Sequence, residues 1–197
     1  MDTLECIKTR HSTRKFKAEQ VSSELLEKVI TAGRLAPSGK HKEQNHFIVI
    51  KNQEVLAKLV LLVREEFAKM EVTPENADDF GGAIKLSKKG TYVFKYNAPI
   101  LIVVANKKNY GNNIADASCA MENMMLMANE LDLGSCWINQ LRWLNENEVI
   151  VSYLRTLGLA DDERVYASLA LGYPDTPDSL PIRKGLPLKG NLVTYVD

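Results

Sequence analysis

Residues 99–105 read Pro-Ile-Leu-Ile-Val-Val-Ala, and residues 114–132 read Ile-Ala-Asp-Ala-Ser-Cys-Ala-Met-Glu-Asn-Met-Met-Leu-Met-Ala-Asn-Glu-Leu-Asp. β-branched residues dominate the first run, which is too short for a helix, so it predicts a buried strand. The second run is apolar nearly all round, which predicts a helix buried on every side. In a domain of this size, such a helix would be a central one shared with a partner subunit.

Shorter elements surround this pair. Apolar periodicity and caps predict helices over residues 2–9, 22–33, 53–70 and 145–157, and strands over 47–50, 134–139 and 166–172. The segment after Pro74 contains Gly81-Gly82 and is expected to be loop-rich, as lids and binding segments are. Its aromatic residues Tyr92, Phe94 and Tyr96 could contact a substrate or could be ordinary loop or sheet aromatics.

The composition is that of an ordinary globular protein, with 45% hydrophobic and 25% charged residues among 197. A single domain spanning 1–197 is expected. Lys plus Arg and Asp plus Glu both number 25, and this balance argues against a nucleic-acid partner. The three cysteines lack a Cys-x-x-Cys pair, acidic residues occupy the start, and no apolar run could span a bilayer. We therefore expect a cytoplasmic protein without a membrane partner.

Several familiar motifs are missing from the sequence. It contains no Gly-x-Gly, so the Rossmann dinucleotide fingerprint is absent. Ser38 lacks the flanking glycines of a nucleophile elbow. His41 and His46 have no third ligand at metal spacing, so no metal site is expected.

A cationic cluster near the start can carry chemistry. Two guanidiniums, an imidazole and two hydroxyls lie within Arg10-His11-Ser12-Thr13-Arg14. Such groups can give a phosphate dianion charge-assisted hydrogen bonds, and arginine adds bidentate geometry. Taken alone, such a basic cluster is more often a solvated face than a phosphate site.

Segments in a fixed order along almost the whole chain resemble the nitroreductase family of flavoproteins. They are Arg10-His11-Ser12-Thr13-Arg14-Lys15-Phe16, Ala36-Pro37-Ser38-Gly39 with Phe47-Ile48-Val49-Ile50, Asn97 to Val104, Asp116 to Met125 with Leu133 to Ile138, and Leu171-Gly172-Tyr173-Pro174 with Arg183-Lys184. The resemblance implies an α+β fold: a central, mostly antiparallel sheet flanked by helices in an intertwined homodimer. A C-terminal extension, residues 177–197, would dock on the partner subunit.

The resemblance also implies a cofactor, FMN, and its contacts. Arg10, His11, Ser12 and Arg14 would hold the phosphate and ribityl chain, and Arg183 with Lys184 would close on the phosphate. The remaining contacts would be Pro37, Ser38 and Gly39 from the partner chain, and Trp137, Ile138 and Asn139 at one ring face, with a backbone N–H near Asn139 directed at flavin N5.

One motif departs from the family pattern. His41 and Glu43 stand where the family has Asn and then Gln, and Gln44 or Asn45 would replace them after a local shift. Trp137, taken alone, is more typical of a core residue than of a cofactor contact. Cys136 is expected to be a buried hydrophobe rather than a nucleophile.

The function implied is an oxidoreductase of the nitroreductase type. NADH or NADPH would deliver hydride to the flavin and leave, and a nitroaromatic, quinone or similar electron-poor acceptor would follow in a ping-pong cycle. Arg14 would stabilise negative charge on the reduced flavin, and no protein side chain would be a general acid. The alternatives are a fold relative with dehalogenase or other flavin chemistry, and a dimer that binds flavin or a phosphorylated ligand without nicotinamide turnover.

Overall fold

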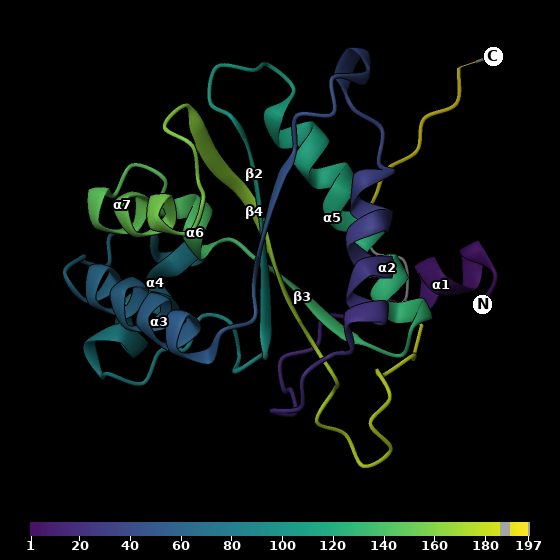
Figure 1. The fold of residues 1–197 in the computed structure, drawn as a ribbon, viewed down its shortest axis with the longest axis horizontal. Coiled ribbons are helices and arrows are strands. Elements are labelled where there is room, and N and C mark those ends of the chain that lie inside the picture. Colours follow the sequence, from purple (N-terminus) through teal and green to yellow (C-terminus); the bar gives the residue numbers. More distant parts are fainter. Residues whose placement is uncertain (186–189, 197) are drawn as a thin grey trace.

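The computed structural model describes residues 1–185 and 190–196 as one sheet with helices on both faces (Figure 1). The strands are β1 (His46–Ile50), β2 (Ile100–Lys107), β3 (Gly134–Ile138) and β4 (Glu163–Gly172). The helices are α1 (Thr3–Thr9), α2 (Ser23–Arg34), the 3-10 turn η1 (Gly39–His41), α3 (Gln53–Ala68), α4 (Ala77–Lys88), α5 (Asn113–Glu130), α6 (Gln140–Trp143) and α7 (Glu148–Thr156).

The sheet has the order β1-β2-β4-β3, and every neighbouring pair is antiparallel. β2 and β4 are central, and β3 forms one edge. This confirms the expected α+β class with an antiparallel sheet. None of the helices in the described ranges is both long and apolar enough to cross a bilayer.

Strand β2 separates two hydrophobic cores. Successive side chains of a strand point to opposite faces. Leu101 and Val103 therefore pack with α3, α4, α6 and α7, whereas Ile100 and Ile102 pack with α2 and α5. Both faces are covered, which explains why residues 99–105 read as an unbroken apolar run. Figure 1 shows the two helix layers on either side of the sheet.

The segment after Pro74 is only partly a loop, and the prediction for it was wrong over residues 77–88. Residues 77–88 form α4, with Asp78 and Asp79 in the first turn and Lys85 and Lys88 in the last. These charges complement the helix dipole. The Gly81-Gly82 pair contributed to the prediction of a loop, but Gly81 lies inside the helix and packs close to Val72.

Two further expectations need correction. The helix predicted over 145–157 with Asn145 as its cap begins later, because Asn147 caps it and its side chain accepts from the Ile150 N–H. Asn145 instead joins the sheet, with its amide accepting from the Val165 N–H at 2.8 Å. Helix α5 is not buried on every side of the single chain, since Cys119 and Glu122 are exposed.

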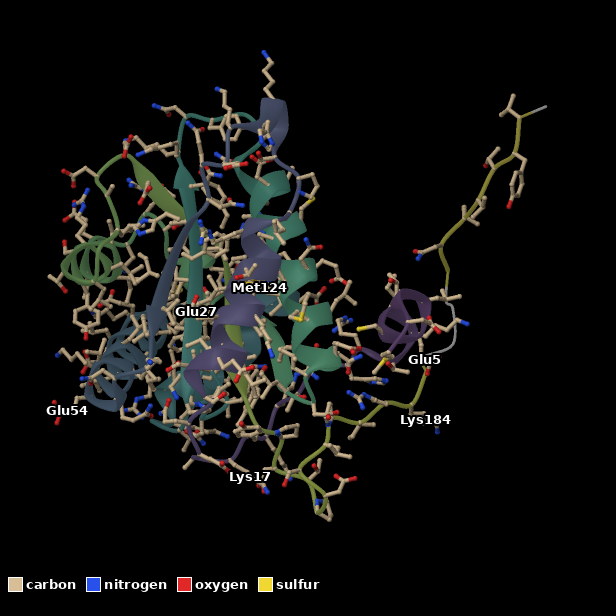
Figure 2. All side chains as sticks on the ribbon, turned by 45° about the vertical axis from the view of Figure 1, so that its right-hand side comes forward. Glu5, Lys17, Glu27, Glu54, Met124 and Lys184 are labelled. Carbon is tan, nitrogen blue, oxygen red and sulfur yellow. The ribbon has the colours of Figure 1, made fainter. Side chains whose placement is uncertain are left out.

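The C-terminal extension has no regular structure where it is described. Its residues 186–189 and 197 lie outside the described residues. Residues 190–196 run away from the body of the protein (Figures 1 and 2), and Leu192 and Tyr195 are 97% and 86% exposed. Docking of this tail on a partner stays a prediction, as does the single domain over 1–197.

Candidate cofactor site

The cationic cluster lies along the outer edge of β3. Ser12 forms a parallel bridge with Ser135, and the Thr13 N–H donates to the Ser135 carbonyl at 2.8 Å. A Cβ on Gly134 would lie 2.7 Å from Thr13 Cγ2. Glycine at position 134 therefore allows the cluster segment to approach the sheet edge this closely.

The same segment is held from its other side by the chain that follows β4. The Asp175 N–H donates to the Lys15 carbonyl at 3.0 Å, and the Lys17 N–H donates to the Tyr173 carbonyl at 2.9 Å. Phe16 forms an antiparallel bridge with Pro174. Backbone pairing on two sides thus fixes the positions from which the Arg10–Lys15 side chains extend.

Three side chains of the cluster influence the Cys136 thiol on β3. Burial raises the pKa of Cys136, and the nearby Arg14, Ser12 and Arg10 side chains oppose that rise. Cys136 is 3% exposed, as expected of a buried hydrophobe. The Arg14 guanidinium lies 6.0 Å from the centre of the Tyr96 ring, and Arg10 Nε lies 3.9 Å from Glu122 Oε1.

The first part of the tail reaches this cluster. His11 Nε2 contacts the Lys184 carbonyl oxygen, and Figure 2 shows Lys184 on the chain that passes beside α1. The Arg183 guanidinium donates to the Asn129 carbonyl and pairs with Asp132 Oδ1 at 2.7 Å. Its Nε is buried and has no partner among the described residues. The structure therefore brings the tail residues next to the first motif.

A cavity of about 240 Å³ opens beside these groups. Its lining combines cations, hydroxyls and one carboxylate: His11, Ser12, Thr13, Arg14, Lys15, Pro174, Asp175, Thr176 and Ile182. Sequence reasoning missed Lys15 as a lining residue although it belongs to the quoted motif. It also missed Asp175 and Thr176, which join the site only through the pairing of two segments distant in sequence.

The end of β3 holds the residues expected at the ring face. Trp137 Nε1 donates to Asn139 Oδ1 at 2.7 Å, which fixes both side chains relative to each other. Ile138 is 2% exposed. Trp137 is half-buried and packs against the core that contains α2 and α5, so it contributes to that core, as expected from the residue type alone.

Pro37, Ser38 and Gly39 lie away from this site within one chain. The Gly39 N–H donates to Asp116 Oδ1 at 3.0 Å in the first turn of α5, whereas Arg183 bonds Asn129 near the end of that helix. The two positions on α5 are about 20 Å apart at 1.5 Å per residue. One chain therefore does not bring its two motifs together.

The structure shows which residue can replace the family's Asn and Gln in the second motif. His41 Nε2 lies 3.0 Å from Glu43 Oε1 in an exposed pair. The Asn45 side chain donates to the Asp116 carbonyl at 3.0 Å and accepts from Asn106 at 2.9 Å, so it supports the framework. Gln44 is half-buried, and no hydrogen bond of its side chain is found among the described residues. Of the two substitutes considered, Gln44 has the more available amide.

The fold and the cavity together define a class: an α+β protein whose antiparallel sheet carries, at its outer edge, a cavity lined by cations and hydroxyls. Comparisons with known proteins agree. The model of the nitroreductase family matches residues 7–173. A nitroreductase of Bacteroides fragilis, solved with bound FMN, is 32% identical with a TM-score of 0.87, and the match covers 100% of both chains.

Two other relatives broaden the comparison. A nitroreductase of Desulfitobacterium hafniense, also solved with bound FMN, is 26% identical with a TM-score of 0.81 over 100% of both chains. Iodotyrosine deiodinase of Hydra vulgaris is 29% identical over 209 residues, which cover 94% of this chain and 70% of that protein. The chain belongs to the nitroreductase family.

Proposed function

We propose that this protein is an FMN-dependent oxidoreductase that passes electrons from NADH or NADPH to a small electron-poor acceptor. The observation that carries the proposal is the cavity at the edge of β3, which His11, Ser12 and Arg14 line together. The names of the two FMN-containing relatives support the choice of cofactor.

The residues present fit the phosphate of FMN. The cavity offers the Ser12 hydroxyl and the Arg14 guanidinium. Arg183 directly follows the lining residue Ile182, and its buried Nε is a donor without a described partner. A buried donor without a partner is costly, and a phosphate oxygen would satisfy it. His11 and Lys184, which already touch, would close the tail over the bound group.

Bound FMN would supply the redox chemistry, accepting hydride from NAD(P)H and then reducing a nitroaromatic, a quinone or a similar acceptor in a ping-pong cycle. The chain supplies position and charge. Arg14 would stabilise negative charge at the adjoining edge of the ring, and Trp137, Ile138 and Asn139 would support one ring face. In this proposal no side chain has to act as a general acid.

A homodimer completes the proposed site. Pro37, Ser38, Gly39 and Gln44 lie too far from the cation cluster in their own chain, so we assign them to the flavin of the partner subunit. Exposed apolar residues on α1 and after α2 favour such a partner, since Leu4, Ile7 and Leu35 are 59%, 52% and 76% exposed. Large exposed apolar side chains that cluster in this way are typical of interfaces.

A second candidate is reductive dehalogenation of an aromatic substrate. The similarity to the Hydra vulgaris iodotyrosine deiodinase favours considering it. Both candidates need the same phosphate site and differ in the acceptor. Analysis of products, reduced nitro compounds against released halide, separates them.

We expect the purified protein to be yellow, with about one FMN per chain. Anaerobic NADH or NADPH should bleach its visible absorption, and a nitroaromatic or quinone should restore it. Flavin that stays oxidised with both nicotinamides would contradict the oxidoreductase and favour a flavin-binding dimer without turnover. A colourless protein that does not take up FMN would contradict the cofactor itself.

A further inference from the structure

A second cavity, of about 410 Å³, lies beside the first. Its lining comes from the cluster segment, the end of α4, the chain before β2 and the chain after β4: Arg14, Lys15, Phe16, Leu86, Thr91, Tyr92, Val93, Tyr96, Asn97 and Asp175. Arg14, Lys15 and Asp175 line both cavities. The two cavities are therefore neighbours, and Arg14 and Lys15 lie between them.

A hydrogen bond connects this second cavity to the end of β3. Gln140 Nε2 donates to the Tyr92 hydroxyl oxygen at 2.6 Å, and Gln140 directly follows Asn139, where the flavin ring face is proposed. Because the Tyr92 oxygen accepts this bond, its hydroxyl hydrogen remains able to donate elsewhere. The Phe67 ring supports the Tyr92 ring edge-to-face, with centres 6.0 Å apart.

The charges around the second cavity favour an anion. Arg14 and Lys15 face it with one carboxylate, Asp175. Arg14 already lies against the Tyr96 ring, whereas Lys15 has no ion-pair partner within residues 1–185 and 190–196. With two cations and one carboxylate, the cavity carries a net positive charge. The unpaired Lys15 side chain is available to bind an anion.

The walls of the second cavity favour a flat ring. Tyr92, Tyr96 and Phe16 line it, together with the apolar Leu86 and Val93. Aromatic side chains bind planar ligands through stacked or edge-to-face contacts. An aromatic ligand with a single negative charge would match both the walls and the cations.

We propose that the second cavity is the acceptor site, and that it selects small aromatic acceptors bearing a carboxylate, which Lys15 holds. The Tyr92 hydroxyl would donate to an oxygen of the group that is reduced. This inference rests on the proposed function and specifies its substrate class.

The test compares 4-nitrobenzoate with its neutral counterpart 4-nitrobenzamide on the flavin-loaded enzyme. Lys15→Gln removes the charge and keeps a side chain of similar reach. Lys89→Gln makes the same change on an exposed residue at the end of α4, outside the cavity. The measurements are KM and kcat for both compounds, their binding to the oxidised holoenzyme by calorimetry, and the flavin content of each variant.

We expect wild type to bind 4-nitrobenzoate more tightly than the amide. Because Lys15 also lines the first cavity, the variants are compared at equal flavin occupancy. Under that condition, Lys15→Gln should raise KM and the dissociation constant for the benzoate about fivefold relative to those for the amide, the scale of a solvent-exposed ion pair. Lys89→Gln should change neither compound. Raised salt should reduce the preference, because mobile ions screen exposed charges.

The inference would be overturned if Lys15→Gln changed the constants for both compounds equally, or if wild type did not prefer the benzoate to the amide. Normal flavin content and normal NADH oxidation in the same proteins would still support the proposed function. A protein without flavin would overturn both. A benzoate-specific loss in the Lys89 variant as well would show that general surface charge, rather than this cavity, selects the anion.

Discussion

Replacement of Arg10 by alanine is expected to weaken FMN binding by roughly 10- to 150-fold, which corresponds to about 1.5–3 kcal/mol for a hydrogen bond to a charged group. The Arg10 side chain is only 26% exposed and lies next to the Ser12–Arg14 segment. Its ion pair with Glu122, at 3.9 Å, is at the limit of contact, so its loss should cost little. Titration of the apoprotein with FMN, followed by the quenching of flavin fluorescence, measures the effect.

Arg155→Ala is the matched control for this measurement. Arg155 also pairs with a surface carboxylate, Asp161 at 2.8 Å, but it lies on α7. The Arg155→Ala substitution should leave FMN affinity unchanged. If the Arg10 variant bound FMN as tightly as wild type, Arg10 would not contact the phosphate. An equal loss of FMN affinity in both variants would indicate a general effect of lost positive charge.

Replacement of Phe67 by alanine is expected to lower the free energy of unfolding by about 3–5 kcal/mol, as large-to-small changes of buried aromatic residues do. Phe67 is 0% exposed, and its ring lies 6.0 Å from those of both Phe80 and Tyr92. The cavity left behind would lie in the core shared by α3, α4 and α7. Urea denaturation of the apoprotein measures the change.

Val149→Ala serves as the comparison, because Val149 lies on α7 and is 43% exposed. Its loss should change the unfolding free energy by less than about 0.5 kcal/mol, as expected for a surface position. A Phe67 variant that lost less than about 1 kcal/mol would show that this core repacks around the gap, and would contradict the tight packing assigned to it.

Local sequence patterns correctly predicted the helices and strands for which apolar periodicity and caps agreed. The run from Pro99 to Ala105 predicted a buried strand, and Asp2 and Ser22 cap the helices that follow them. The prediction of a loop after Pro74 was wrong over residues 77–88, because it relied on Gly81-Gly82 and not on the charge pattern, which is typical of a helix. Packing of α4 against α3 stabilises a helix that its own sequence only weakly favours.

The candidate site was predictable only in part, for a physical reason. Arg10, Ser12 and Arg14 are close in sequence, so one motif revealed them. The backbone hydrogen bond between Asp175 and Lys15 and the ion pair of Arg183 with Asp132 depend on how distant segments pack. The sequence alone does not encode those contacts in any local pattern. The separation of Gly39 from Arg183 along α5 likewise became visible only in the fold.

The proposed cofactor site depends on a phosphate held at the edge of β3, and a comparison of two flavins tests this most directly. FMN and riboflavin share the ring and the ribityl chain and differ only in the phosphate. We expect the wild-type apoprotein to bind FMN at least about 100-fold more tightly, since several charge-assisted hydrogen bonds would be lost with riboflavin. Equal affinity for the two flavins would contradict the phosphate site, and with it the role assigned to the first arginine cluster.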